Sequence, residues 1–201
     1  TSAATNDWGV ASAKWVQADG TPAPASSLAN FHLGHGLLPK FGANVVPLRG
    51  TRMLVLSTGT ARQPEDPDYR AVSGFTKGYQ CNPPDGFPKE SPSCPGKITG
   101  EPNDAVGIEM ALRVPSNAHG FTFQFNFYTY EWPNYICSQY NDFFVALVSP
   151  IPEGQNDGNV SFDNQGNPVS VNNVFLDACG CPDNPPTGCL AGNKNYKCSL
   201  G

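Results

Sequence analysis

Two stretches near the middle of the sequence alternate apolar and polar residues with a period of two. In residues 105–114 every second position is Val, Ile, Met or Leu, and in residues 120–128 every second position is Phe. This period is typical of strands that bury one face, whereas helices repeat every 3.6 residues. We therefore expect two strands whose apolar faces belong to the core. The second strand would contribute Phe121, Phe123, Phe125 and Phe127.

Glycine and proline interrupt the rest of the chain. The sequence contains 21 Gly and 20 Pro, which favour turns and extended backbone over helix interiors. Turn-rich segments cover residues 63–68, 82–101 and 153–158. Further strands are expected at residues 8–17, 52–57, 143–148 and 169–176, and the third of these, apolar on both faces, is expected to be a fully covered central strand.

This pattern predicts an all-β fold. Several strands joined by long loops rich in Pro and Gly fit a two-sheet β-sandwich or a jelly-roll-like fold. We expect residues 1–201 to form a single domain, in which residues 1–45 are the less certain N-terminal segment. Residues 177–201 form a cysteine-rich C-terminal stretch with almost no apolar periodicity.

Charge and hydropathy exclude two classes of function. The formal net charge is −5 with only 12 Lys and Arg, so the basic surface that nucleic acids need is missing. No apolar run approaches the ~20 residues of a membrane-spanning helix, so membrane insertion is not expected. The first residues do not resemble a signal peptide, and we expect any such peptide to have been removed from a secreted protein.

Cysteine spacing indicates an oxidising, extracellular compartment. Only two of the cysteines are close together, with one residue between them, and zinc sites usually need thiolates in pairs separated by two residues. Disulfides that hold loop-rich chain together are therefore expected, with Cys81–Cys94 as the first bridge. The pairing of the last four cannot be deduced from spacing, and the odd count means that one thiol is free, forms a link between chains, or has a partner outside this sequence. The seven are Cys81, Cys94, Cys137, Cys179, Cys181, Cys189 and Cys198.

The densest group of polar residues lies in the loop between two expected strands. Glu131, Asn141 and Asp142 supply oxygen atoms there, and oxygen ligands suit calcium. In the alternative interpretation, Asp142 caps the loop through backbone N–H groups and Glu131 is solvated. The same loop carries large aromatic side chains that could stack on a sugar ring. These are Trp132, Tyr135 and Tyr140.

Other candidate sites are weaker. Residues 157–166 space oxygen-bearing side chains like a calcium loop, but Pro168 stands where an EF-hand needs Glu, so Asx-type turns are expected. Asn159 begins the one glycosylation sequon. His32 and His35 lie in a Gly-flanked stretch and are expected to be loop residues, since no third metal ligand is near. Glu109 and Glu131 are the pair that a glycosidase interpretation would use.

Four segments resemble the bacterial choice-of-anchor L domains. The run GFTFQFNFYTYEWPNYICSQYNDFFVALVSP is similar to the central motif of that family, and PVSVNNVFLDACGC is similar to its Val-Ser-Ile-Asn-Asn segment. RMLVLSTGTA and GEPNDAVGIEMALRVP resemble upstream segments of its cysteine-rich, myxobacterial-type members. The resemblance spans most of residues 45–200 and implies an extracellular, surface-attached protein with no established enzymatic activity. Glu131, Asn141 and Asp142 match its polar motif positions.

The resemblance also implies that the domain is incomplete. Members of the family continue past the cysteine-rich stretch into further strands, whereas this sequence stops at Gly201, so either it is a fragment or the missing strands come from elsewhere. A sheet that lacks a strand exposes backbone N–H and C=O groups and invites strand addition from another copy. The odd cysteine fits an intermolecular link in the same arrangement.

These features together predict a non-enzymatic extracellular module with a structural or adhesive role, as a subunit of a surface fibre or appendage. Its expected partners are further copies of itself or other surface proteins. The alternative is a lectin-like jelly roll that binds a glycan through Trp132, Tyr135 and Tyr140. A hydrolase, the third hypothesis, would need two carboxylates facing each other across an open cleft.

Overall fold

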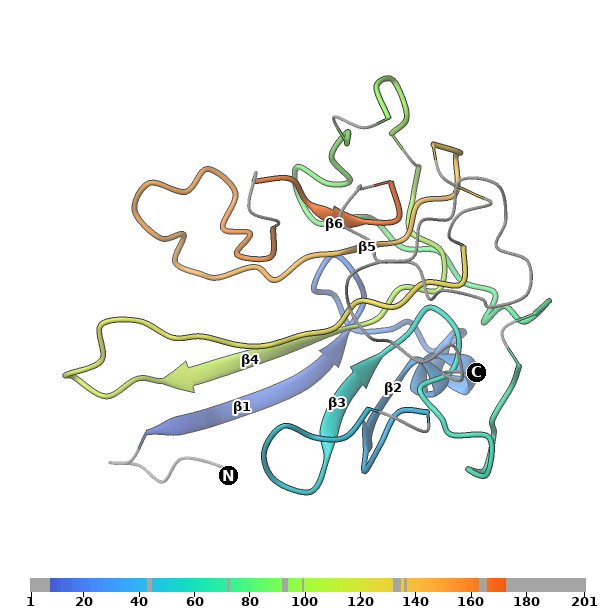
Figure 1. Cartoon of the computed structure of the whole chain (residues 1–201), viewed down its shortest axis with the longest axis horizontal. Helices are drawn as coiled ribbons and strands as arrows, with labels where there is room; N and C mark the ends of the chain where they lie inside the picture. The colour runs from blue at the N-terminus through green and yellow to red at the C-terminus, as the bar shows by residue number, and fades with distance from the viewer. Residues whose placement is uncertain are drawn as a thin grey trace, which may run out of the picture. The chain divides into compact units, whose positions relative to one another are not determined.

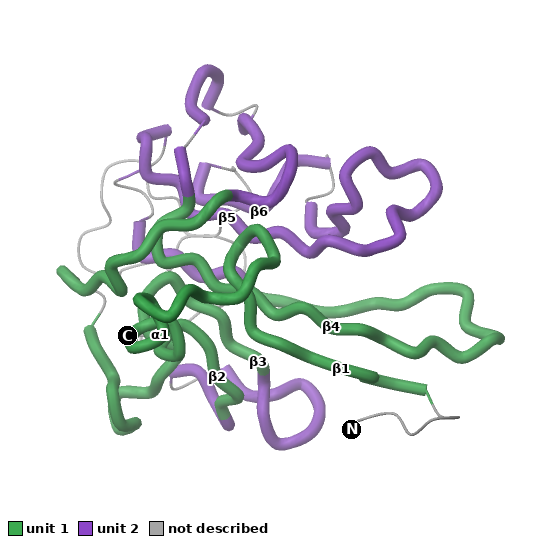
Figure 2. The backbone as a smooth tube through the Cα atoms, turned by 180° about the vertical axis from the view of Figure 1, so that it is seen from behind, with its two compact units in different colours: residues 1–38, 54–82, 102–126 green, residues 39–53, 83–101, 127–201 purple. Residues whose placement is uncertain are grey.

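The computed structural model describes residues 8–42, 45–71, 73–91, 94–98, 100–131, 135, 137–162 and 166–172 (Figure 1). Within these ranges the chain is mostly strand and irregular backbone with little helix, which confirms the β character expected from the sequence. The contacts between its residues divide the chain into two compact units (Figure 2). Unit 1 comprises residues 1–38, 54–82 and 102–126, and unit 2 comprises residues 39–53, 83–101 and 127–201.

A long two-stranded ribbon is the main element of unit 1. Strand β1 (Gly9–Val16) pairs antiparallel with β4 (Gly107–Arg113), and Trp15 lies opposite Ile108 in the register. The register shifts between Val10 and Ser12, which marks a β-bulge in β1. Strand β4 confirms the strand that the period-two pattern predicted over residues 105–114, but the expectation that its apolar face belongs to the core is wrong in part, since Met110 and Leu112 are 46% and 54% exposed. Strand β1 confirms the further strand expected at residues 8–17.

The remaining elements of unit 1 surround one end of this ribbon. Helix α1 (Leu28–Phe31) continues into the 3₁₀ helix η1 (His32–Gly34) and then into β2 (His35–Leu38). Strand β2 pairs with β3 (Met53–Leu56), as expected for residues 52–57. The core of the unit is small and consists of Val16, Phe31, Leu33, Leu38, Ala61 and Tyr79.

Unit 2 has shorter strands. Strand β5 (Phe143–Phe144) pairs antiparallel with β6 (Val169–Ser170). The prediction of a covered strand over residues 143–148 is wrong, since β5 ends at Phe144 and Leu147 is 48% exposed. The backbone N–H of Ala146 donates to the side-chain oxygens of Asn159 and Ser161, which interrupts the ladder after β5.

The expected phenylalanine core is also wrong. No strand is assigned to residues 118–130, and Phe121, Phe123 and Phe125 are 60%, 42% and 41% exposed. Alternation predicts that the three rings share a face, and they do stack in sequence, with ring centroids 6.4 Å and 5.7 Å apart. What the described residues of unit 1 lack is a second layer to cover that face.

Candidate functional site

The predicted metal residues lie where β5 and β6 meet in unit 2. The carbonyl of Asp142, just before β5, accepts a hydrogen bond from the N–H of Val171 (2.9 Å). One residue earlier, Asn141 Oδ1 accepts from the N–H of Asn172 at 3.2 Å. Asn141 is buried, so its oxygen anchors the end of β6. The short strand pair thus fixes the positions of Asn141 and Asp142.

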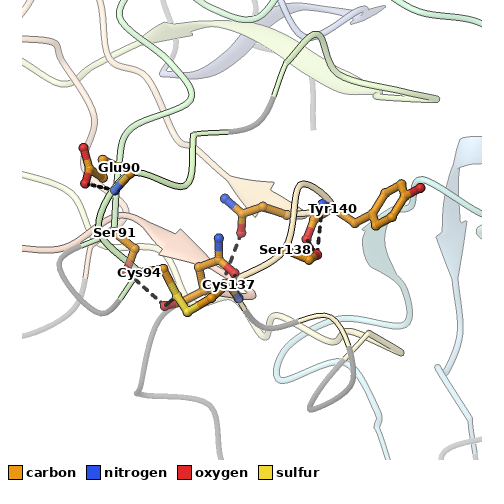
Figure 3. The surroundings of a disulfide bond; sticks show 9 residues. Glu90, Ser91, Cys94, Cys137, Ser138 and Tyr140 are labelled. Carbon is orange, nitrogen blue, oxygen red and sulfur yellow. Dashed lines mark hydrogen bonds between the residues drawn. A yellow bond between two sulfur atoms is a disulfide. The ribbon is translucent and has the colours of Figure 1, made fainter.

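Asn172 connects this corner to two loops. Its carbonyl accepts from Ser91 Oγ at 2.9 Å, and its Oδ1 accepts from the N–H of Cys137 at 2.8 Å. Cys137 is itself bonded to Cys94, with 5.1 Å between the two Cα atoms (Figure 3). Asn172 is 1% exposed, and its Nδ2 has no hydrogen-bond partner within the part of the chain that the structure describes. A buried amide with an unused donor is costly by about 1–3 kcal/mol.

Glu131 and Asp142 form a carboxylate pair. Burial of the Glu131 side chain, with a further contribution from the negative charge of Asp142, raises the pKa of Glu131. A hydrogen bond from the backbone of Asp142 opposes this shift in part. Glu131 Oε2 is buried and has no hydrogen-bond partner among the described residues. An unpartnered carboxylate oxygen beside a second carboxylate is a position that a proton or a cation would stabilise.

The donor set suits a hard cation only in part. Two carboxylates supply oxygen, but the oxygen of Asn141 is already hydrogen-bonded to Asn172. Calcium takes six to eight oxygen ligands, so carbonyls or water would have to complete the shell. Among the described residues, no group of three or more His, Cys, Asp or Glu side chains is arranged to hold a metal.

Two of the three predicted sugar-stacking residues lie together. Tyr135 and Tyr140 meet edge to face with ring centroids 5.7 Å apart, and they are 46% and 54% exposed. Tyr140 is held by reciprocal hydrogen bonds of 3.0 Å between its backbone and Ser138 Oγ. Trp132 lies outside the described residues. The pair is an exposed aromatic surface close in sequence to Glu131.

The predicted Cys81–Cys94 bridge is wrong, because Cys94 is bonded to Cys137. The bond joins residues 43 apart in sequence, a separation at which local spacing carries no signal. Cys81 is half-buried in unit 1 and its N–H donates to the carbonyl of Pro102. The remaining cysteines, Cys179, Cys181, Cys189 and Cys198, lie outside the described residues.

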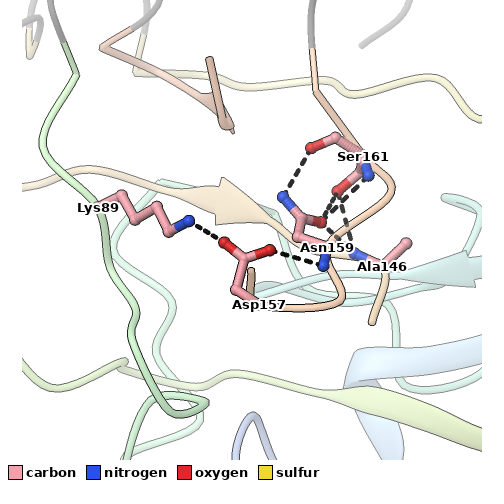
Figure 4. A network of polar contacts seen from close by, with 5 residues as sticks. All are labelled: Lys89, Ala146, Asp157, Asn159 and Ser161. Atoms are coloured by element: carbon pink, nitrogen blue, oxygen red, sulfur yellow. Dashed lines mark hydrogen bonds and ion pairs between the residues drawn. The ribbon is translucent and has the colours of Figure 1, made fainter. Parts of the chain in front are cut away.

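A second polar network in unit 2 is structural (Figure 4). Lys89 Nζ forms an ion pair with Asp157, whose other oxygen accepts from the N–H of Asn159 at 2.9 Å. Asn159 Oδ1 accepts from both the N–H and the hydroxyl of Ser161, at 3.1 Å and 2.7 Å. These contacts confirm the predicted Asx-type turns. Asn159 is buried and its Nδ2 donates to Ser161, so this sequon is inaccessible to glycosylation in the folded unit.

The prediction that His32 and His35 are loop residues is wrong. His32 begins η1, and His35 begins β2, where its ring stacks on Trp15 with centroids 4.0 Å apart. Burial lowers the pKa of His35 to about 4, and the positive charges of Arg62, His32 and Lys77 add to this effect. The ring therefore packs as a neutral aromatic surface.

Sequence reasoning missed a buried ionic cluster in unit 1. Lys77 is 3% exposed, and its Nζ donates to the carbonyls of three consecutive residues, 57–59, at 2.7–3.2 Å. Asp104 is 6% exposed and accepts from Thr76 Oγ1 and from the N–H groups of Lys77 and Tyr79. Because Lys77 lies 18–27 residues from these partners, no local sequence pattern reveals the cluster.

No helix within the described ranges is long and apolar enough to cross a membrane. The chain matches no protein-family model, no curated protein and no solved structure.

Proposed function

We propose that this chain is a non-enzymatic extracellular module with a structural or adhesive role, a subunit of a surface fibre or appendage. The observation that carries the proposal is the Cys94–Cys137 disulfide beside Asn172. Among its described elements, unit 2 contains only one pair of two-residue strands. Because so few backbone hydrogen bonds of a sheet fix its loops, the disulfide is needed to hold them together. Proteins whose loops are held by disulfides belong to oxidising compartments.

The same proposal includes the fold and the family. A two-sheet sandwich needs a second apolar layer over the exposed face of Phe121, Phe123 and Phe125, and further strands or another copy would supply it. The resemblance to choice-of-anchor L domains also favours an extracellular location and a role without enzymatic activity.

Calcium at Glu131 and Asp142 is the proposed cofactor. The carboxylate oxygen of Glu131 that lacks a hydrogen-bond partner would coordinate the cation. The positive charge would then offset the cost of burying the ionised carboxylate. Binding to the folded state alone stabilises a protein by about 2.7 kcal/mol when the ligand is at 100 times its Kd.

Thermal unfolding at neutral pH with calcium and with a chelator tests the site. We expect calcium to raise the melting temperature of the wild type and of Glu153→Gln, an exposed position of the same unit, but not that of Glu131→Gln. Equal responses of all three proteins would exclude calcium at Glu131.

The function itself is tested on intact producing cells. Antibody labelling without permeabilisation should detect the protein at the surface, and electron microscopy should show ordered assemblies that reductant or chelator disperses. A protein confined to the cell interior would contradict the proposal.

Glycan binding is the second candidate, and the exposed pair Tyr135–Tyr140 favours it. Edge-to-face rings present an apolar surface on which a sugar ring can stack. A glycan array should then show binding that Tyr140→Ala abolishes. As a matched control, Tyr130→Ala removes another exposed tyrosine of the same unit and should leave binding intact. An array without signal would exclude this candidate.

A further inference from the structure

A cysteine in a strained backbone conformation lies close in the chain to the candidate calcium site of unit 2. Cys137 has a φ of 54°, in the left-handed region, which residues with a Cβ adopt rarely and at a cost. Such a conformation persists only where the surrounding structure fixes it. Two contacts of Cys137 contribute to this: the disulfide to Cys94 (Figure 3) and the hydrogen bond from its N–H to Asn172 Oδ1.

A turn connects Cys137 to Glu131. The N–H of Tyr135 donates to the carbonyl of Glu131 at 2.9 Å, and the N–H of Ser138 donates to the carbonyl of Tyr135 at 3.2 Å. In the turn that the second bond closes, Cys137 is the third residue, a position at which a positive φ favours Gly. The turn therefore keeps its shape only while Cys137 is held in a conformation that Gly would adopt more easily.

A second connection runs from Cys137 to Asp142. Asn172, which accepts the N–H of Cys137, donates its own N–H to Asn141 Oδ1 at 3.2 Å. The next residue, Asp142, donates a backbone hydrogen bond to the carboxylate of Glu131. The disulfide is thus linked to both carboxylates, along the chain on one side and through Asn172 on the other.

Buried polar groups without partners gather at the same corner. Ser170 and Asn172 are 3% and 1% exposed, and neither Ser170 Oγ nor Asn172 Nδ2 has a hydrogen-bond partner within the described ranges. Together with Glu131 Oε2 they are all the buried side-chain atoms of the described residues that lack one. Such groups are costly, and a bound ion with its water shell would relieve that cost.

We propose that the Cys94–Cys137 disulfide is a redox switch that controls calcium binding at Glu131 and Asp142. While the bond is intact, Cys137 keeps its left-handed conformation and the two carboxylates stay together. Once the bond is reduced, Cys137 relaxes to a negative φ, the turn opens and the cation is released. This inference rests on the calcium site of the proposed function and adds its regulation.

Reduction requires a dithiol as the co-reactant. One thiolate of the dithiol attacks the sulfur of Cys137, which is half-buried, whereas Cys94 is 2% exposed. The S–S bond breaks, and its electron pair leaves on Cys94 Sγ, which takes up a proton. The second thiol of the dithiol then displaces Cys137. Two electrons and two protons pass to the protein, and the dithiol becomes a disulfide.

Calorimetric titration of the full chain with calcium chloride at neutral pH tests the switch. We expect the oxidised wild type to bind calcium. The double variant Cys94→Ser, Cys137→Ser should raise the Kd by at least about tenfold, because the turn is no longer fixed. The matched control is Cys81→Ser, which removes a cysteine of unit 1 outside this bond and should change the Kd by less than about twofold.

A second double variant separates the strained conformation from the loss of the bond. Glycine adopts a positive φ without the penalty of a Cβ. Cys94→Ser, Cys137→Gly should therefore bind calcium at least about threefold more tightly than Cys94→Ser, Cys137→Ser. Equal affinities would show that the conformation of Cys137 does not control the site, and would overturn the inference.

Calcium must in turn oppose reduction of the bond, because coupling between two equilibria is reciprocal. In dithiothreitol redox buffers, saturating calcium should lower the equilibrium constant for reduction by the factor that separates the affinities of the oxidised and reduced forms. Alkylation and mass spectrometry of the peptides that contain Cys94 and Cys137 measure this constant. Glu131→Gln should abolish the effect of calcium, and an unchanged constant in the wild type overturns the inference.

Hydrogen exchange distinguishes a local switch from general stabilisation. In the double serine variant the amides of Tyr135 and Ser138 should lose protection, whereas those of Val148 and Val160, bonded to carbonyls elsewhere in unit 2, should keep it. Loss at all four positions would mean that the bond only stabilises the unit, and would overturn the switch.

The outcomes separate the switch from the proposals on which it rests. Equal calcium affinity of the oxidised wild type and both double variants overturns the switch and leaves the calcium site intact. A wild type that binds no calcium overturns the calcium site and the switch together. Neither result contradicts an extracellular structural module, which surface labelling decides separately.

Discussion

At the scale of single residues, the buried charged groups of unit 1 show how hydrogen bonding makes the burial of charge tolerable. Lys77 and Asp104 are nearly inaccessible to solvent; the ammonium group of Lys77 donates three hydrogen bonds, and the carboxylate of Asp104 accepts three. Buried charges are tolerated only with such complete pairing. The close approach of backbone to Lys77 also restricts Gly34, where a Cβ would lie 2.6 Å from Nζ and 2.9 Å from the carbonyl oxygen of Ser57.

Gly34→Ala should therefore destabilise the protein by about 2–4 kcal/mol, because it overpacks the site and displaces Lys77 Nζ from its carbonyls. Gly59→Ala is the matched control, since its Cβ would meet only Ser57 Oγ at 3.5 Å. Urea unfolding measures both. Similar losses in the two variants would show that Gly34 is not specially constrained.

The free energy of unfolding should depend on pH through the titration of His35. Its folded pKa is about 4, below the ordinary 6.5, so the unfolded chain binds more protons between these values. Stability should be fully present above pH 6.5 and decline as the pH falls towards 4. The loss is on the order of 1 kcal/mol once solvent screening of this partly exposed ring is allowed for.

Replacement His35→Phe keeps an aromatic ring against Trp15 and removes the titration. We expect its denaturation midpoint to change less between pH 7 and pH 4.5 than that of the wild type. His32→Phe, at an exposed position, is the control. Parallel pH profiles for wild type and His35→Phe would show that other groups cause the decline.

At the scale of elements, unit 2 depends on links between loops. Strands β5 and β6 have two residues each, and the segments around Ser91, Cys94 and Cys137 converge on Asn172 instead. A disulfide that closes a loop of this length stabilises mainly by limiting the unfolded chain.

Cys94→Ser and Cys137→Ser should each lower the free energy of unfolding by about 2–4 kcal/mol. The double variant should lose no more than either single one, because all three remove the same bond. Additive losses in chemical denaturation would contradict the pairing of these two cysteines.

The ribbon of unit 1 provides an element-scale prediction of its own. An isolated two-stranded ribbon is only marginally stable in water. The amides of β1 and β4 should therefore exchange with solvent faster than the amides of the buried segment around Ala61. Hydrogen exchange measures the protection of both segments, and equal protection would contradict a marginally stable ribbon.

At the scale of the whole molecule, low charge and exposed apolar surface act together. The formal net charge of −5 makes identical copies repel one another weakly. Added salt should therefore tighten self-association by screening that repulsion. Sedimentation at low and high ionic strength tests this expectation, and association that weakens with salt would indicate a polar interface.

The sequence by itself determined the local structure. Strict alternation predicted β4, and the further strands expected at residues 8–17 and 52–57 correspond to β1 and β3. Oxygen side chains spaced around Asn159 predicted its turns. Each depends on residues close in the chain, for which backbone geometry and side-chain period are sufficient.

The tertiary structure alone decided which residues are covered and which meet. It left Phe121, Phe123 and Phe125 at the surface, because alternation defines a face but not what packs on it. It paired Cys94 with Cys137 across 43 residues and buried Lys77 among distant carbonyls. At the candidate site the sequence supplied Glu131 and Asp142, but only the fold revealed the buried carboxylate oxygen that lacks a partner. Burial and long-range contacts depend on how segments converge in space, and no local pattern encodes that.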